Sequence, residues 1–381
     1  MMRKAAITFS RIFVGCLFIF SGFIKANDPL GFSYKLDEYF EIFHMPFLIP
    51  VTVWMAMGIC VLEIALGVIL LLGEFMEFTA WMLLGLIVFF TFLTGYSAVT
   101  GAVSDCGCFG DFLHLTPWTS FTKDIVLLVF ILVIFIYRKH IMPVFNLKWS
   151  KFHVAMAVLI PSLFTIYCYS YLPIIDFRAY KVGNNLREQM TLPLGAKRDS
   201  TVLKLVYKDK TNNTEKGYLM SELPFSDSVW MANHEFVKQD NQVIVEGDKP
   251  KITDFKIWSE DSPDITAEIL DDPNYRLWII CYDLTKSSRS SFDDIVKLAN
   301  ECDKHGVKTI GLTSTDYSIT DPFRHDVNAA FPFYYCDGTV LKTMIRSNPG
   351  IMLMKGSTVM GMWHYHQTPS FEKLNKKFFS K

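Results

Sequence analysis

The chain has 381 residues, of which 51% are hydrophobic and 20% charged, and its formal net charge is -1. This composition is too apolar for an ordinary soluble protein of a single domain. A net charge close to zero also offers no basic field for a nucleic acid, which we exclude as a partner. Apolar residues crowd the first half, whereas charged residues recur every few positions after Asp176. We therefore expect a membrane part followed by a water-soluble part.

Five apolar segments in the first half approach the length of about 20 residues that a helix needs to cross a bilayer. They cover residues 6–24, 51–72, 78–99, 125–137 and 154–172, and the fourth is expected to begin near Pro117. The first is not interpreted as a cleaved signal peptide, because it is too long, carries Arg11 and lacks a small-residue cleavage site before Lys25. The expected fold of this half is an α-helical transmembrane bundle with the lipid bilayer around it.

Basic residues in the short loops predict the orientation of the spans. Arg3 and Lys4 precede the first span, and a second basic group lies between the fourth and fifth spans, at positions 138, 139, 148 and 151. An even number of spans separates the two groups, so both can be cytoplasmic, and the fifth span then places the soluble part outside. We predict a bacterial inner membrane protein with a cytoplasmic N-terminus and a periplasmic C-terminal domain.

The loop between the third and fourth spans, residues 100–118, contains Cys106 and Cys108 on either side of Gly107. Neighbouring thiols outside the cytosol oxidise readily, and glycine tolerates the backbone angles of a small disulfide ring. A strained disulfide is more oxidising, so Cys106 and Cys108 are the predicted catalytic redox pair. Two alternatives stay open, a permanent staple of the loop and a half-site for a metal. Two thiolates, even with His114, are too few for a closed zinc site, so we predict no metal.

Arg11 and Glu63 are ionisable residues inside apolar spans, where an isolated charge costs several kcal/mol. We expect both to face the bundle interior and to be paired, either with each other or with neighbouring groups. Together with Lys25 they are the candidate cofactor-binding residues. Gly15 and Gly22 share one face of the first span, which predicts the close approach of another helix.

Further charges mark the ends of the first and fourth spans, as Lys25 with Asp28 and Lys123 with Asp124. We expect them to line the mouth of the bundle near the cysteine loop, or simply to mark the membrane interface. Between the first two spans, residues 27–50 have the spacing of an amphipathic helix in the interface. That helix is predicted to be a surface connection, with a cover over the cysteine loop as the alternative.

Several of these stretches carry a family resemblance. Residues 11–15, 18–25 and 28–31, with 62–67 and 70–73, resemble the DoxX superfamily, and the loop at 106–110 narrows the resemblance to its MauE branch, associated with methylamine utilisation. The resemblance covers about residues 5–140. It implies a four-helix membrane core linked to thiol redox maturation of exported proteins. In DoxX relatives it implies quinone-coupled sulfur chemistry, which makes a quinone the candidate cofactor. Nothing in the residues points to methylamine itself.

The soluble part begins with short strands at residues 202–207 and 216–219, in a small β-rich region. The elements expected after it are a buried strand at 275–283, a helix at 291–304, a strand at 307–313, a helix around 321–330, a hairpin of 350–354 and 359–363, and a terminal helix from Thr368. This order resembles the thioredoxin fold over about residues 268–381, with Asn348 and Pro349 at the place of its cis-proline.

One departure from that resemblance decides the expected role of the domain. An active thioredoxin carries Cys-X-X-Cys at the start of the helix after its first central strand, where the helix N-terminus lowers the thiol pKa. Residues 285–291 occupy that place and contain no cysteine. We expect a domain that is redox-silent there and holds an extended peptide of a partner near Asn348 and Pro349.

The other cysteines are interpreted mainly as structural residues. Cys16 and Cys60, within the first two spans, are expected to be small packing residues. Cys281 in the buried strand and Cys302 in the following helix are expected in the core. Cys336 precedes Asp337 and Gly338 in a predicted turn and is expected to be the most exposed thiol.

Four regions result: a four-span membrane domain at 1–145, a cytoplasmic loop with the fifth span at 146–175, a small β-rich extracytoplasmic region at 176–267, and a thioredoxin-like domain at 268–381. The predicted function is a membrane-anchored thiol-disulfide component that acts on thiols of exported proteins or on a periplasmic redox partner. The alternatives are a non-enzymatic membrane scaffold with a structural cysteine pair, and a quinone-linked sulfur oxidoreductase subunit.

Overall fold

The computed structural model describes residues 2–103, 107, 109–113, 115–145, 147–193, 195–197, 200–225, 227–245 and 247–380. Cys106, Cys108 and His114 lie outside the described residues. The chain divides into two compact units, one formed by Met1–Asn184 with Lys256–Lys381 and the other by Asn185–Phe255. The first unit therefore contains both the helical bundle and the C-terminal domain.

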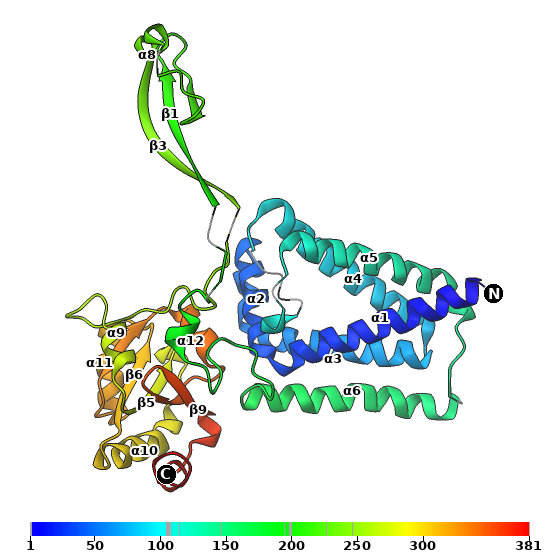
Figure 1. Cartoon of the computed structure of the whole chain (residues 1–381). Coiled ribbons are helices and arrows are strands. Elements are labelled where there is room, and N and C mark those ends of the chain that lie inside the picture. Colours follow the sequence, from blue (N-terminus) through cyan, green and yellow to red (C-terminus); the bar gives the residue numbers. More distant parts are fainter. Residues whose placement is uncertain are drawn as a thin grey trace. The chain divides into compact units, whose positions relative to one another are not determined.

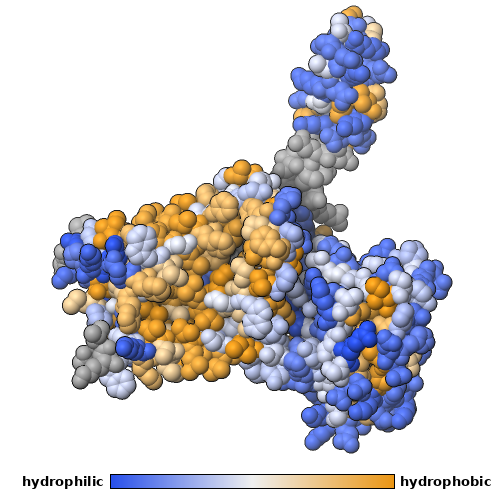
Figure 2. Space-filling model, turned by 180° about the vertical axis from the view of Figure 1, so that it is seen from behind, coloured by the Kyte–Doolittle hydropathy of each residue, from blue (hydrophilic) through white to orange (hydrophobic). Residues whose placement is uncertain are grey.

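Within the described residues, five helices are long and apolar enough to cross a membrane, which confirms the five predicted spans as helices. They belong to α1 (Met2–Asn27), α3 (Thr52–Leu72), α4 (Met76–Thr100), α5 (Pro117–Tyr137) and α6 (Leu147–Ser170). These helices run side by side as a bundle (Figure 1). Its surface is largely hydrophobic on the face that Figure 2 shows, whereas the C-terminal domain presents a mainly hydrophilic surface.

Both predicted basic groups lie at one end of this bundle. The guanidinium of Arg3 lies 4.4 Å from the centroid of the Tyr137 ring, so the start of α1 meets the end of α5. Arg138 lies at the same end, where its Nε is 2.9 Å from a carboxylate oxygen of Glu77. This is the arrangement that the distribution of basic residues requires. Which side of the membrane this end faces stays a prediction.

Glycines bring α1 and α3 into close contact. A Cβ added at Gly67 would lie 2.8 Å from the carbonyl oxygen of Gly15 and 3.1 Å from the backbone nitrogen of Ile19. A Cβ at Gly22 would lie 3.0 Å from the Cβ of Glu63. Small residues at such positions let two membrane helices approach closely. The packing role predicted for Gly15 and Gly22 is confirmed.

The two cysteines of these spans differ. Cys60 is completely buried and packs in the cluster under α2, as predicted. Cys16 is exposed on the outer surface of α1, so the prediction that it packs inside the bundle is wrong. A cysteine is small and apolar enough for either environment, and only its place on the helix face decides between them.

Helix α2 (Pro29–Ile42) follows α1 and is the predicted amphipathic helix between the first two spans. Asp28 caps its N-terminus by accepting a hydrogen bond from the backbone nitrogen of Gly31 at 2.9 Å. Phe32, Leu36 and Phe40 are buried in a cluster that also contains Cys60 of α3. A short 3-10 helix, Pro46–Val51, leads into α3. The polar face of α2 is thereby left toward the end of the bundle.

The C-terminal domain of the first unit is built on a six-stranded sheet of order β4-β7-β6-β5-β8-β9. The strands are β4 (Ile257–Trp258), β5 (Tyr275–Cys281), β6 (Lys308–Thr313), β7 (Phe333–Cys336), β8 (Gly350–Lys355) and β9 (Thr358–His364). The helices are α9 (Thr266–Asp271), α10 (Phe292–Lys304), α11 (Tyr317–Asp326), α12 (Gly338–Met344) and α13 (Phe371–Leu374).

Three strands of this sheet, β5 to β7, are parallel, and β8 and β9 run antiparallel beside β5. Leu277 and Ile279 of β5 pack with Phe292 and Ile295 of α10 in the domain core. The predicted strands at 275–283 and 307–313, the helix at 291–304 and the hairpin are confirmed. The peptide bond before Pro349 is cis, as predicted. Strand β7 and helix α12 were not predicted, because each is too short to show a clear period.

The second unit is a small β structure by itself. Its sheet has the order β2-β1-β3, formed by β1 (Ser200–Asp209), β2 (Glu215–Leu219) and β3 (His234–Val245), all antiparallel. Two short helices, α7 (Leu186–Gln189) and α8 (Ser228–Asn233), belong to it. The unit is narrower than the predicted β-rich region at 176–267, because the segments on either side of it join the first unit.

The glycine contact between α1 and α3 can be tested by adding one methyl group. Gly67→Ala should destabilise the bundle by about 1–3 kcal/mol, since the added carbon meets backbone atoms that cannot move aside. The matched control is Gly85→Ala on α4, where an added Cβ meets no atom within 4 Å. Thermal unfolding of both variants in detergent should show a loss for Gly67→Ala only. Equal unfolding temperatures would contradict the proposed contact.

Candidate functional site

A cavity of about 500 Å³ lies where the C-terminal domain meets the end of the bundle opposite the basic groups. Helix α2 lines one side of it, and Thr339, Lys342 and Arg346, from α12 and the residues after it, line another. The cysteine loop contributes Gly107, Gly110 and Asp111, and the segment after α6 contributes residues 173 and 175–178. We call this cavity the chamber. Its walls are rich in charged side chains of both signs, as expected of a wet site.

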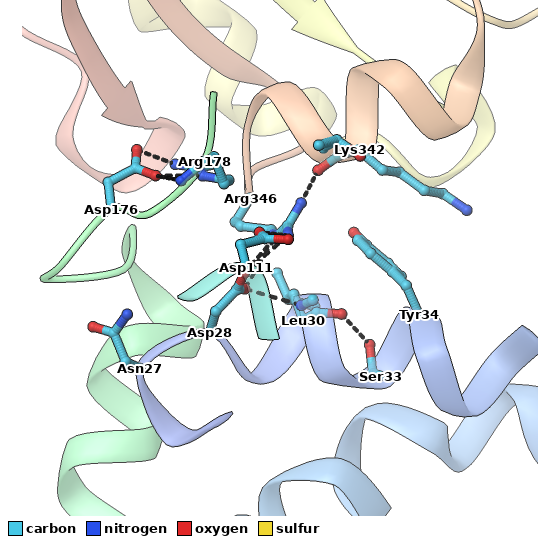
Figure 3. A network of polar contacts seen from close by, with 12 residues as sticks. Asn27, Asp28, Leu30, Ser33, Tyr34, Asp111, Asp176, Arg178, Lys342 and Arg346 are labelled. Carbon is cyan, nitrogen blue, oxygen red and sulfur yellow. Dashed lines mark hydrogen bonds and ion pairs between the residues drawn. The ribbon is translucent and has the colours of Figure 1, made fainter. Parts of the chain in front are cut away.

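The side chain of Arg346 joins the three parts of the chain that surround the chamber. Its Nε donates to both carboxylate oxygens of Asp28 at 2.9 Å, and its Nη2 lies 3.1 Å from a carboxylate oxygen of Asp111 (Figure 3). Its Nη1 donates to the carbonyl oxygen of Lys342 at the end of α12. We call Arg346, Asp28 and Asp111 the latch. Arg346 is only 5% exposed, so most of its charge is balanced by these partners rather than by water.

The charges of the latch reinforce one another. Burial by itself would raise the pKa of Asp28, but the adjacent guanidinium of Arg346 outweighs it, and the pKa is lowered. Burial likewise opposes the charge of Arg346, yet Asp28 and Asp111 raise its pKa further above the usual value. A carboxylate with a lowered pKa contributes its stability at neutral pH and loses it as the pH falls through that pKa. Asp28 and Arg346 are therefore both charged at neutral pH.

The segment between α6 and the C-terminal domain closes the same wall. Asn27, at the end of α1, exchanges two hydrogen bonds with the backbone of Ile175, at 2.7 and 3.0 Å. Arg178 makes a two-pronged ion pair with Asp176, at 2.8 and 2.7 Å, and donates to the carbonyl oxygen of Met344 at 3.2 Å. Cations at the carboxyl end of α12 are favoured by the helix dipole. Figure 3 shows how these residues lie around Arg346.

Tyr34 of α2 forms the contact with the central strand of the sheet. Its hydroxyl lies 3.4 Å from the hydroxyl of Tyr282, which directly follows β5. The cations of Lys342 and Arg346 lie 5.1 and 5.6 Å from its ring centroid. Burial raises the pKa of Tyr34 well above its ordinary value, so it is a neutral hydrogen-bonding group. The carboxyl end of β5, where sheets of this kind usually bind ligands, therefore faces the bundle.

The described part of the cysteine loop is positioned from both sides. Gly107 has a φ of +66°, and an added Cβ would lie 2.9 Å from Cγ of Lys35 on α2, so a glycine is required there. The ring of Phe109 lies 5.9 Å from that of Phe20 on α1. Asp111, at the end of the loop, pairs with Arg346 of the latch. The predicted catalytic residues Cys106 and Cys108 lie outside the described residues, but Gly107 between them lines the chamber.

The predicted partner-binding residues lie next to the latch. Asn348 donates from its side chain to the carbonyl oxygen of Asp283 at 2.7 Å, and its backbone oxygen accepts from the backbone nitrogen of Ser288 at 3.3 Å. Pro349 is buried. The backbone carbonyl before Pro349 thus already accepts a hydrogen bond from within the chain. The donor belongs to the segment at 285–291, which ends in a short 3-10 helix, Arg289–Ser291. A peptide at this position stays a proposal.

The candidate cofactor-binding residues do not come together as one group. Glu63 pairs with Lys25, whose Nζ lies 2.5 Å from its Oε1, and both side chains are at most 3% exposed. Arg11 instead donates to the carbonyl oxygens of Leu70 and Leu71, so it caps the far end of α3. Arg11 and Glu63 therefore do not contact each other, and of the two expected pairings the structure has the one with neighbouring groups.

A second ion pair, of which the carboxylate is buried, lies beside the first. Nζ of Lys123 is 2.8 Å from Oδ1 of Asp124, and the hydroxyl of Thr94 donates to Oδ2 of Asp124 at 2.9 Å. Asp124 is 1% exposed. Lys25 lines the chamber, as the prediction for the mouth of the bundle requires, whereas Asp124 faces the interior.

The cysteines of the C-terminal domain are all in its core. Burial raises the pKa of each of these thiols, Cys281, Cys302 and Cys336, to about 12. Thiols of that kind are poor nucleophiles at neutral pH. The core positions of Cys281 and Cys302 are as predicted, but the prediction of an exposed Cys336 is wrong, because it ends strand β7 and is 0% exposed.

Sequence reasoning missed the residues that complete the site. Arg346 and Asp111 were not predicted as functional, since neither lies in a recognisable motif and they are 235 positions apart. The only signal was an arginine two residues before Asn348. Its importance depends on a contact between distant parts of the chain, which no local pattern reveals.

Removal of the Arg346 guanidinium should open the chamber. In Arg346→Met the carboxylates of Asp28 and Asp111 lose their partner, which should lower the free energy of unfolding by about 3 kcal/mol. This value is at the low end for a buried ion pair, because Asp111 is partly exposed. Hydrogen exchange of amides in α2 and α12 should then speed up roughly 100-fold, which can be read by mass spectrometry. The control is Arg289→Met, which breaks a solvent-exposed pair with Asp326 and should change exchange little. Unchanged exchange in Arg346→Met would contradict the latch.

Comparison with known proteins gives a partial family assignment. Residues 3–137 match the family model of the methylamine utilisation protein MauE, and this stretch includes α1 to α5 with the cysteine loop. Protein TlpB of Flavobacterium psychrophilum is 26% identical over 165 residues, which cover 41% of this chain and 42% of that protein. The match thus spans less than half of that relative. No solved structure matches the chain significantly. The membrane region of this protein is MauE-like.

Proposed function

We propose that the protein is a membrane-anchored thiol-disulfide component, in which Cys106 and Cys108 exchange electrons with a dithiol or disulfide of an exported partner. The observation that carries this proposal is the chamber. It has Gly107, the residue between the two cysteines, in one wall and residues of the C-terminal domain in another. The MauE-like match of residues 3–137 is consistent with it.

The distribution of the other thiols supports the assignment to the loop. Of the six cysteines in the described part of the chain, five are buried in a core or between helices, and Cys16 lies on the outer surface of α1. The place where a thioredoxin carries its redox pair holds only Thr285, Lys286 and serines with Arg289. We propose that this domain, with its thioredoxin-like order of elements, serves as the partner-binding module and that the cysteine loop supplies the chemistry.

The chamber also suggests how partner binding by the C-terminal domain and thiol exchange by the cysteine loop are joined. Asp111 of the cysteine loop binds Arg346, which lies two residues before Asn348. A partner segment that binds near Asn348 and Pro349 would therefore lie beside the loop. We propose an extracytoplasmic, in bacteria periplasmic, location for this end of the protein, on the basis of the basic residues at the opposite end.

Substitution of the loop cysteines distinguishes this proposal from a scaffold with a permanent staple. Cys106→Ser and Cys108→Ser should each abolish electron exchange while the protein stays folded, and the remaining thiol should trap a mixed disulfide with a partner. The trapped species should run as a higher band on a non-reducing gel and disappear with reductant. The disulfide of the wild type should have a potential well above the roughly -300 mV typical of structural disulfides.

The matched control is Cys16→Ser, which removes an exposed thiol of α1 and should leave trapping and exchange unchanged. A staple would give a different result. Its loss would lower the thermal stability and trap nothing, and a double serine variant with full exchange activity would refute the proposal.

A further inference from the structure

The sheet of the second unit has a long free edge. Strand β3 is its longest strand and lies at the outside, where, among the described strands, it pairs only with β1. Its residues 235–240 are all exposed, and even the apolar side chains of Phe236 and Val237 are 52% and 41% exposed. The outward backbone N–H and C=O groups of such an edge are a ready template for one more strand.

Two charged residues lie on this edge strand. In the regular stretch 238–243 of β3, Lys238 and Asp240 are the charged residues, and they are two positions apart. Their side chains therefore lie on the same face of the sheet. Across the ladder with β1, Lys238 lies opposite Val206, and Asp240 lies opposite Lys204. A strand added at the outer edge would meet the same two charges from the other side.

A second copy of β3 can extend the sheet antiparallel only in certain registers. The two-fold axis between the copies is perpendicular to the sheet, so each residue points to the same face in both copies. Neighbours along a strand point to opposite faces, whereas residues opposite each other on paired strands share a face. The numbers of two opposed residues must therefore add up to an even number.

Charge selects one of these registers. With Gln239 on the axis, Lys238 of each copy lies opposite Asp240 of the other, so two ion pairs form across one interface. The registers on either side place Lys238 opposite Lys238, or Asp240 opposite Asp240, and like charges directly opposite are destabilising. The other edge strand, β2, has no such register, because its charges, Glu215 and Lys216, are adjacent and add up to an odd number.

We propose that β3 pairs with β3 of a second copy of this chain, antiparallel and with Gln239 on the two-fold axis. The two three-stranded sheets then form one continuous sheet. Asp240 lies between Lys204 of its own copy and Lys238 of the second copy. The interface uses the same edge of both copies, so it closes at a dimer and leaves no free β3 edge. This inference does not depend on the proposed thiol exchange.

The pairing is expected to be weak in dilute solution and populated in the membrane. A register shift between Phe236 and Lys238 marks a bulge at Val237, which bounds the paired stretch. A short ladder with exposed ion pairs contributes little binding energy. Two copies confined to one membrane, however, meet at a much higher effective concentration than in solution. The pairing is therefore tested in membranes.

Cysteine cross-linking tests the register. Full-length Gln239→Cys, in a Cys16→Ser background, is oxidised mildly in the membranes of the expressing cells and run on a non-reducing gel. Cα atoms of opposed residues in antiparallel strands are about 4.5–5.5 Å apart, which a disulfide can bridge. The yield of a dimer that disappears with reductant should exceed the yield of the background at least fivefold.

Glu235→Cys is the matched control. Residue 235 is exposed on the same strand, but in this register it lies roughly 25 Å along the strand from its own copy. It should give no more dimer than the background. A dimer yield equal to that of Gln239→Cys would indicate chance collision and overturn the register.

Charge variants test what selects the register. In the Gln239→Cys background, Lys238→Ala removes the attraction, and Lys238→Glu also places like charges opposite each other. The dimer yield should fall about threefold in the first and about tenfold in the second. Lys251→Glu makes the same charge change at an exposed lysine outside the sheet and should leave the yield unchanged.

Two outcomes would overturn the proposal. Equal dimer yields in the Lys238 variants and in their parent would show that charge does not set the register. A Gln239→Cys chain that stays monomeric in membranes, or that cross-links only to a different protein, would exclude the pairing of two copies. Lys238 is exposed, so its variants should keep the unit folded, and an unchanged thermal unfolding temperature checks this.

Discussion

A charge that leaves water must find a partner, and in this protein the pairing of buried charges determines how the bundle and the C-terminal domain of the first unit are joined. The guanidinium of Arg346 has five donors in a rigid plane, and it reaches Asp28, Asp111 and the carbonyl oxygen of Lys342. Each of these acceptors belongs to a different segment. An apolar contact of the same area would tolerate sliding, whereas a bidentate ion pair fixes distance and angle together. Arg346 therefore holds α2, the cysteine loop and the end of α12 together at one wall of the chamber.

Inside the bundle the same constraint acts at a different depth. Lys25 comes from the end of α1 and reaches down to Glu63, which is set about three turns into α3 from its start at Thr52. Gly22 lies opposite Glu63 and lets the two backbones approach. Packing and electrostatics thus depend on each other, since a larger residue at 22 would separate the helices that bring the two charges together.

The membrane part was largely predictable from the sequence, and the site only in part. Apolar length is a local property, so the five spans and the amphipathic helix α2 could be found by inspection. The glycine face of α1 was visible from spacing alone. The partner of Glu63 was not, because Arg11 and Lys25 are both cations of the first span and only their depth separates them. Arg346 was invisible for the same kind of reason, as its partners lie 235 and 318 positions away.

The C-terminal domain shows the opposite limit. Its central strands and α10 were predicted because each has a strong period, whereas the four residues of β7 and the seven of α12 do not. Because β7 was not predicted, Cys336 was assigned to a turn and not to a buried strand. Because α12 was not predicted, the helix that carries Lys342 was missed. Both errors concern short elements, and one of these elements, α12, lines the chamber.

Asp28 is both the N-cap of α2 and the partner of an arginine that is made 318 residues later. During synthesis the bundle is inserted first, and until the distant arginine arrives the carboxylates of Asp28 and Asp111 lack their guanidinium partner. The described residues of the cysteine loop, such as Gly107 and Asp111, thus form their wall of the chamber only when the C-terminal domain has folded against the bundle. A chain whose last domain misfolds would leave the carboxylates of Asp28 and Asp111 without the guanidinium that balances them, and this end of the bundle would stay exposed to quality-control proteases.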